Sequence, residues 1–187
     1  MNQIYWGKPV SGFGDLNGEI IIVGLAPAAH GATRTGRVFT GDKSADFLFK
    51  CLFKSGLSNQ SNSDHLKDGL KLKNTFITLA LRCVPPNDKP TKDELKNCSI
   101  FFKEELDMIK NKKVIVALGK IAFDTCIKFY KKNNGLKGSF KFSHGIKYHI
   151  NGLTIFGCYH PSPRNVNTKR INETKMIYLF KRAKKLI

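Results

Sequence analysis

The sequence has 187 residues, of which 41% are hydrophobic and 25% charged, a composition typical of a globular domain. We therefore expect a single domain over residues 1–187, with a core that needs no disulfide or metal. The longest apolar stretch is broken by glycine and proline and is too short for a bilayer, and the first residues lack a signal-peptide pattern, which predicts a cytoplasmic protein with no membrane partner.

Charge is the strongest signal in the composition. Lys and Arg number 32 against 14 acidic residues, which gives a formal net charge of +18. Between Thr125 and Asn172 the sequence has nine Lys or Arg residues and no Asp or Glu. The electrostatic field of so positive a protein attracts polyanions. We therefore expect a nucleic acid as the partner and a location at the nucleoid. A generally lysine-rich surface is the alternative that composition leaves open.

Short apolar runs alternate with helical patterns along the chain. Residues 20–24 (IIIVG) predict a buried strand, residues 46–53 an amphipathic helix, and residues 76–81 a second strand. Thr91 and Glu94 have the spacing of a capping box at the start of a helix. The apolar stripe of that helix is expected to face the core and comprises Leu95, Cys98, Phe102 and Leu106.

The alternation continues to the end of the chain. Residues 113–118 (KVIVAL) predict a third strand and residues 121–129 a helix. Residues 140–150 are expected to form a pair of edge strands, and residues 154–158 a fourth core strand that is followed by prolines, where no helix or strand should continue. Residues 171–187 predict a closing helix. Its inward residues are expected to be Met176, Phe180, Ala183 and Ile187.

The predicted strands are continuous apolar runs, which indicates a parallel sheet that is covered on both faces. The predicted fold class is therefore a three-layer α/β/α sandwich with a short, mostly parallel central sheet. In such folds ligands bind at the carboxyl ends of the strands. The loops after Gly24, Leu81 and Cys158 have unusual compositions, and all three are expected at this edge.

The first of these loops, residues 24–42, reads GLAPAAHGATRTGRVFTGD. Its small residues allow backbone amides to approach a ligand closely. Phe39 is expected to be exposed, and Asp42 is the only acid of the loop. The loop lacks the Gly-Lys-Ser/Thr of a P-loop and the spacing of a dinucleotide fingerprint, which weakens the hypothesis of a nucleotide-binding enzyme. On its own the pattern predicts only a ligand-binding loop.

The last of these loops contains HPSPRN at residues 160–165. Its two prolines restrict the backbone, and a residue before proline is kept out of helical geometry. His160 should therefore be held at the end of a strand. A turn with a capping histidine is the alternative interpretation of this segment alone.

Three motifs occur in a specific order: GLAPAAHG…RTGR-FTGD, RC-PP…KPT and HPSPRN. Together with WGKPVSGFGD at residues 6–15 they resemble the family 5 (type B) uracil-DNA glycosylases of the uracil-DNA glycosylase superfamily, over essentially the whole chain. The resemblance implies base excision repair: a deaminated base, uracil and also hypoxanthine or etheno adducts, is flipped out of DNA and its N-glycosidic bond is hydrolysed. The expected partner is double- or single-stranded DNA with damaged bases, bound by a monomer. A DNA-binding protein of this fold without glycosylase activity is the alternative.

The resemblance assigns catalytic roles. Asp42 positions or activates water, and His160 donates to the uracil O2. The related family 4 enzymes have an acid where this sequence has Leu25, which leaves the water to Asp42. Asn87 is the nearest candidate for the asparagine of the second motif. These roles suit the chemistry, because the bond breaks through a cationic sugar and an anionic base.

The resemblance also assigns binding roles, since the base must leave the stack before it reacts. Phe39 would stack on the flipped base. The base pocket would be lined by Gly24, Ala26, Pro27, Ala28, Phe39 and His160. The segment that enters the duplex would be Ser162, Pro163, Arg164 and Asn165.

Family 4 and family 5 enzymes usually carry a 4Fe-4S cluster with four cysteine ligands. Cys83 and Cys98 match two of these ligands, but the usual N-terminal cysteine pair is absent from this sequence. We therefore expect no complete cluster and no cofactor requirement for catalysis. Truncation of the chain, a misassigned start and loss of the cluster are the open explanations. The other cysteines are expected in the core and are Cys51, Cys126 and Cys158.

Overall fold

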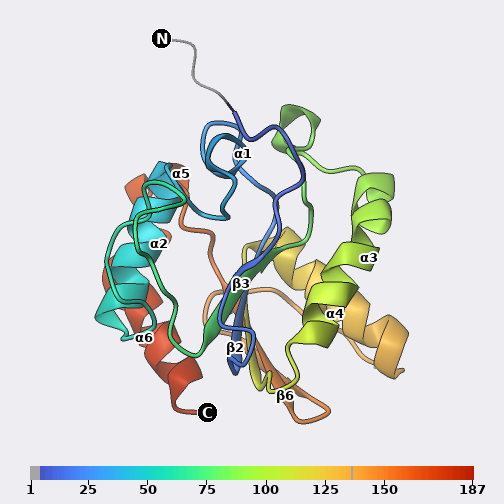
Figure 1. The fold of residues 1–187 in the computed structure, drawn as a ribbon. Helices are drawn as coiled ribbons and strands as arrows, with labels where there is room; N and C mark the ends of the chain where they lie inside the picture. The colour runs from blue at the N-terminus through green and yellow to red at the C-terminus, as the bar shows by residue number, and fades with distance from the viewer. Residues whose placement is uncertain (1–4, 136) are drawn as a thin grey trace.

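A six-stranded sheet forms the centre of the protein in the computed structural model, which describes residues 5–135 and 137–187 (Figure 1). The strand order is β1-β3-β2-β4-β6-β5. The four inner strands are parallel, and the two edge strands pair antiparallel with their neighbours. The predicted mostly parallel sheet is confirmed. The strands are β1 (Phe13–Gly14), β2 (Ile20–Gly24), β3 (Thr75–Leu79), β4 (Val114–Leu118), β5 (Lys147–Ile150) and β6 (Leu153–Cys158).

Helices cover both faces of the sheet: α2 and α6 lie on one side and α3 and α4 on the other (Figure 1). Successive strand residues point to opposite faces. In β2, Ile20 and Ile22 therefore join the core under α2 and α6, whereas Ile21 and Val23 join the core under α3 and α4. The three-layer sandwich is confirmed. The helices are α1 (Ala32–Thr35), α2 (Lys43–Lys54), the 3₁₀ helix η1 (Pro86–Asp88), α3 (Lys92–Met108), α4 (Lys120–Asn134), α5 (Pro163–Asn167) and α6 (Glu173–Lys184).

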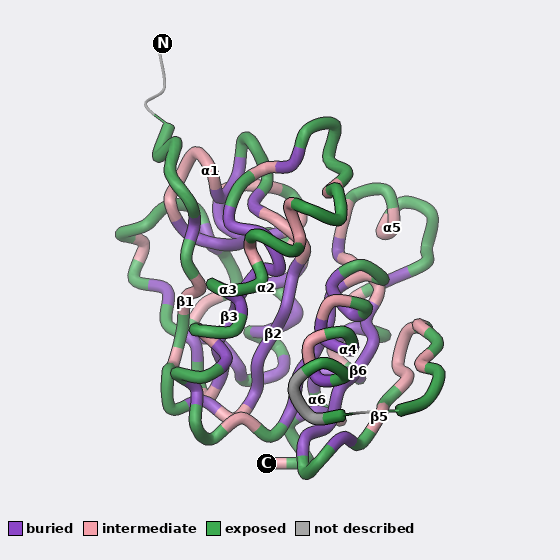
Figure 2. The backbone as a smooth tube through the Cα atoms, turned by 90° about the vertical axis from the view of Figure 1, so that its right-hand side faces the viewer, coloured by how far each residue is buried: buried purple, intermediate pink, exposed green. Residues whose placement is uncertain are grey.

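The strands β2, β3, β4 and β6 are buried along their whole length, as the purple tube in the middle of Figure 2 illustrates. A strand with helices on both faces has no solvent-facing positions, which explains why IIIVG is a continuous apolar run. None of the described helices is long and apolar enough to cross a membrane.

The predicted stripe of α3 is only half correct. The capping box at Thr91 and Glu94 is present, and Phe102 and Leu106 are buried. Leu95 and Cys98 remain half-buried. Leu95 borders an open groove between α3 and α4, so the first half of the stripe keeps contact with solvent.

Of two predictions around the last strands, one was wrong and the other was incomplete. Within residues 140–150 only β5 forms, because the preceding segment crosses over β6 at Gly157, where a Cβ would lie 2.6 Å from the Ser143 carbonyl oxygen. As predicted, β6 ends before the HPSPRN segment, but a helix that was not predicted, α5, begins inside this segment. Ser162 caps this helix and Pro163 is its first residue, a position where the missing N–H of proline costs nothing.

The closing helix α6 begins at Glu173 after a cap by Asn172 and is shorter than predicted. Its core contacts follow the prediction at Met176, Phe180 and Ala183, with Leu179 in addition. Ile187 lies beyond the end of α6 and is half-buried, but it packs against the core as predicted.

Candidate active site

The carboxyl ends of β2, β3 and β6 meet around a small cavity of about 50 Å³. The loop after β2 and the residues after β6 both reach it, as the sheet topology predicts. Ser44 and Leu79 also line it, although the resemblance to the glycosylases assigns no role to either residue. The lining residues are Ala26, Pro27, Ala28, Phe39, Asp42, Ser44, Leu79 and His160.

A larger cavity of about 630 Å³ lies in the groove between α3 and α4, on one flank of the sheet. Its walls are mostly apolar side chains and lysines. Its one carboxylate, Asp124, pairs with Lys120 in the same helix. The one carboxylate of this groove is paired with a lysine of its own helix, whereas the smaller cavity joins a carboxylate, a histidine and an aromatic ring, so the smaller cavity is the candidate active site.

Asp42 combines the role of a helix cap with a position in the cavity. Its Oδ1 accepts hydrogen bonds of 2.9 Å from the backbone N–H groups of Ser44 and Ala45, at the start of α2. No described residue donates to Oδ2, which is therefore free for water. Burial raises the pKa of Asp42, and the two backbone hydrogen bonds partly oppose this shift. A carboxylate with a raised pKa in a cavity is suited to proton transfer.

Gly31 approaches the carboxylate of Asp42 more closely than any larger residue could. A Cβ at position 31 would lie 2.1 Å from Asp42 Oδ2, well inside van der Waals contact. The sequence pattern marked this glycine only as one of several small residues. The structure shows that it leaves space for the acid.

Phe39 is buried rather than exposed, so the expectation of an exposed ring was wrong: its exposed fraction is 8%. Its backbone has φ = 47°, a left-handed conformation that is unusual for a bulky residue and costs about 1–3 kcal/mol. The centroid of the Phe39 ring lies 6.0 Å from that of His160. Gly24 lies behind the ring, because a Cβ there would be 2.9 Å from Phe39. Gly24 thus shapes the pocket without lining it.

His160 lies opposite Phe39 and is a neutral histidine. Burial lowers its pKa to about 4, so the imidazole carries no charge at pH 7 and offers one N–H donor. Within the described residues no group hydrogen-bonds the ring. The Nδ2 of Asn165 donates to the His160 carbonyl oxygen at 2.9 Å, which ties α5 to a residue that lines the cavity.

We expect the lowered pKa of His160 to make the protein less stable in mild acid. The unfolded chain takes up a proton near pH 6.5 and the folded protein only near pH 4, so the stability is present above pH 6.5 and is lost as the pH falls toward 4. The loss is about 3 kcal/mol. Urea unfolding at pH 7 and pH 4.5 should show a smaller loss for His160→Phe than for the parent. Substitution of the exposed His65 by Phe (His65→Phe) should leave the loss of stability as large as in the parent. Equal losses of stability in all three proteins would show that His160 is not the cause.

The segment expected to enter DNA lies at the start of α5, and residues 168–170, which follow this helix, are exposed (Figure 2). Pro163 and Arg164 are exposed, whereas Ser162 and Asn165 are half-buried and engaged in the local hydrogen bonds of α5. Lys128 belongs to the same acid-free stretch of sequence but lines the α3–α4 groove. The stretch therefore does not form one surface, and only its α5 part adjoins the cavity.

Asn87 does not join the cavity. It lies exposed in η1 with φ = 53°, outside the lining residues, so its catalytic role stays a prediction. Cys83 is exposed and Cys98 half-buried. No three His, Cys, Asp or Glu residues of the described chain are grouped as metal ligands, so these residues do not provide the four thiolates of a cubane cluster. The remaining cysteines are buried in the core, as predicted: Cys51, Cys126 and Cys158.

A mostly parallel sheet between helix layers, with a pocket at the carboxyl ends of its strands, defines an α/β protein built to bind a small group at that edge. The model of the uracil DNA glycosylase superfamily matches residues 11–184, and the chain belongs to this superfamily. It is 43% identical over 179 residues to the type-5 uracil-DNA glycosylase of Pyrobaculum aerophilum, covering 96% of this chain and 76% of the relative.

Two further relatives place the chain within the superfamily. It is 40% identical over 184 residues to the type-5 uracil-DNA glycosylase of Thermus thermophilus, covering 97% of this chain and 82% of the relative. It is 31% identical over 171 residues to the type-4 uracil-DNA glycosylase of Sulfurisphaera tokodaii, covering 88% of this chain and 70% of the relative. The resemblance to the family 5 enzymes is confirmed.

Proposed function

We propose that this protein is a monofunctional uracil-DNA glycosylase, which flips uracil out of DNA and hydrolyses its N-glycosidic bond. The observation that carries the proposal is the meeting of Asp42, His160 and Phe39 in one cavity. An acid, a neutral N–H donor and an aromatic ring are the groups that the hydrolysis of a flipped-out nucleotide needs.

The geometry suggests a separate role for each of the three side chains. The C1′–N1 bond breaks with its electron pair moving to the base, and the N–H of His160 stabilises the negative charge on the uracil O2. The carboxylate of Asp42 faces the cationic sugar through Oδ2 and orients a water molecule. That water delivers hydroxide to C1′ and its proton to Asp42, which leaves an abasic site and the free base. Phe39 stacks on the base while it is out of the helix.

A single assay tests the proposal. The protein is incubated with a duplex that contains uracil, hypoxanthine or an etheno base, and alkali then cuts every abasic site. We expect cleavage at uracil after alkali and none before it. No cleavage at any of the three lesions, with DNA binding intact, would establish the alternative of a binding protein.

DNA binding should weaken steeply with salt, because Lys and Arg displace counterions from the phosphates. Arg164 is exposed on α5 beside the cavity, so Arg164→Ala should lower the slope of log K against log salt by about 1. Lys128→Ala removes an equal charge in the α3–α4 groove and should leave the slope unchanged. Equal effects of the two variants in fluorescence anisotropy titrations would argue against α5 as the DNA-facing segment.

We further propose that one domain over residues 1–187 acts as a monomer on DNA in the cytoplasm, at the nucleoid.

Cys83 and Cys98 are the two residues that would contribute thiolates to an iron–sulfur cluster. Such a cluster would be a structural group in this proposal, since the side chains of the cavity carry out the hydrolysis. We expect iron and sulfide analysis of the purified protein to give less than four irons per chain. A stoichiometric four-iron signal would overturn this expectation.

A further inference from the structure

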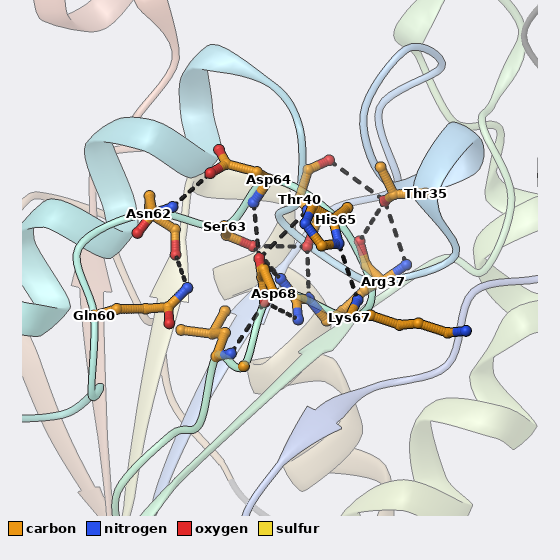
Figure 3. A network of polar contacts seen from close by, with 12 residues as sticks. Thr35, Arg37, Thr40, Gln60, Asn62, Ser63, Asp64, His65, Lys67 and Asp68 are labelled. Carbon is orange, nitrogen blue, oxygen red and sulfur yellow. Dashed lines mark hydrogen bonds and ion pairs between the residues drawn. The ribbon is translucent and has the colours of Figure 1, made fainter.

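A buried ion pair joins the loop that carries Phe39 and Asp42 to a segment that follows α2. The guanidinium of Arg37 donates to both carboxylate oxygens of Asp68, at 2.9 and 2.6 Å, and the exposed fractions of the two side chains are 3% and 5% (Figure 3). Building on the proposed function, we propose that the Arg37–Asp68 pair positions Phe39 and Asp42 for base removal. Neither residue lines the cavity, so both are positioning residues.

Arg37 also donates to two hydroxyl groups, one in its own loop and one in the facing segment. Its Nε donates to Thr40 Oγ1 at 2.9 Å, and its Nη2 donates to Ser63 Oγ at 3.0 Å. The two hydroxyls lie 2.8 Å apart, and the Gly41 backbone N–H donates to the Ser63 carbonyl oxygen at 2.8 Å. The residues on the C-terminal side of Phe39 are thus fixed at two successive positions, immediately before Asp42.

Asp68 organises the other side of the contact. Its carboxylate accepts backbone N–H groups of Asp64, His65 and Leu70 at 2.9, 3.3 and 3.0 Å. Burial opposes the charge of Asp68, but the hydrogen bonds from Arg37 and from these amides hold its pKa well below the usual range. Residues 63–70 therefore wrap around one permanent negative charge, and that charge holds Arg37 in place.

Stability alone is a poor explanation for such a pair. Removing two charges from water is costly, and well-packed apolar residues often stabilise a protein equally well. The planar fork of Arg37 instead supplies directed bonds to Asp68, Thr40 and Ser63 at the same time. The left-handed backbone of Phe39 persists only where its surroundings enforce it. The network provides that enforcement.

The experiment compares two buried ion pairs. Asp68→Asn keeps the shape of the side chain but faces Arg37 with an amide that cannot accept both N–H groups. Glu105→Gln is the matched control, because Glu105 pairs with Arg82 at 2.9 Å with exposed fractions of 14% and 6%, between α3 and the segment after β3. Single-turnover cleavage of uracil-containing duplex and binding of the same duplex are measured below the melting temperature of each variant. Hydrogen–deuterium exchange of residues 35–42 is measured in the absence of DNA.

We expect Asp68→Asn to slow cleavage by about 100-fold, the order expected for a misplacement of about 1 Å, with little change in DNA binding. Exchange in residues 35–42 should accelerate in Asp68→Asn and not in Glu105→Gln. Cleavage and exchange that match the parent would overturn the positioning role, as would equal slowing by Glu105→Gln. A parent protein without cleavage refutes the proposed function instead, and the exchange comparison still tests whether the pair orders the loop. Arg37→Lys, which keeps the charge but not the fork, should reproduce the Asp68→Asn result.

Discussion

Asp42→Asn should lower the rate of base removal by about 10² to 10⁴-fold, while affinity for uracil-containing DNA stays close to that of the parent. Asparagine retains an oxygen that can accept from the Ser44 and Ala45 amides and is as good a helix cap as aspartate. The substitution therefore removes the negative charge and leaves α2 in place. Single-turnover kinetics and binding titrations on the same duplex separate the two effects.

The raised pKa of Asp42 adds two expectations. As the pH is lowered, the rate of base removal should decline with the protonation of Asp42, at a pH above 3.8. The residual rate of Asp42→Asn should show no such decline. Because a raised folded-state pKa gives stability that is lost as the pH rises through it, the ionised acid destabilises the fold at pH 7, and Asp42→Asn should melt at a higher temperature. Asp93→Asn removes an exposed charge in the first turn of α3 instead and should change neither property. An Asp42→Asn variant with full turnover would remove Asp42 from the mechanism.

Gly31→Ala should damage the enzyme almost as severely. The new methyl group would lie 2.1 Å from Asp42 Oδ2, and the carboxylate cannot turn away because the amides of α2 hold its Oδ1. Asp42 must therefore move, and a shift of about 1 Å at a reacting group costs about 100-fold in rate. The measurement is again single-turnover cleavage, together with the free energy of unfolding in urea.

A double-mutant cycle with Asp42→Ala identifies the cause. In that background the oxygen that Gly31→Ala would displace is gone, so the second substitution should cost little further stability. If Gly31→Ala destabilised both backgrounds equally, the strain would lie in the backbone of the loop around Gly31. The close approach to Asp42 would then not explain the loss of activity.

Much of this architecture could be predicted from local patterns. IIIVG and KVIVAL predict strands because a strand buried on both faces must be apolar throughout, and β2 and β4 are such strands. Parallel strands bring their carboxyl ends to one edge, which is why His160 could be expected to lie near Asp42 although the two are far apart in sequence. The roles of individual residues came from the order of the three motifs and the family that they resemble, because composition alone indicates no roles.

The remaining features depend on contacts between distant residues. Asp68 lies in a stretch of ordinary polar composition, and only the fold brings it to Arg37. The left-handed backbone of Phe39 has no local signature, since neither glycine nor asparagine occupies the position, and its burial depends on Gly24 behind it. The prolines of HPSPRN predict the end of a strand and give no sign of a helix, yet proline at the first position of a helix is compatible with its start, as at Pro163 in α5.

The two edges of the sheet bear on whether two copies of the protein can pair strand to strand. At one edge β1 has only two residues, and at the other edge β5 presents exposed Lys147 and His149. Neither edge offers a neighbouring chain a long apolar strand to extend. With a net charge of +18, molecules that gather along a negatively charged polymer also repel one another. Two copies of the protein therefore have neither a strand edge to pair nor opposite net charges to draw them together.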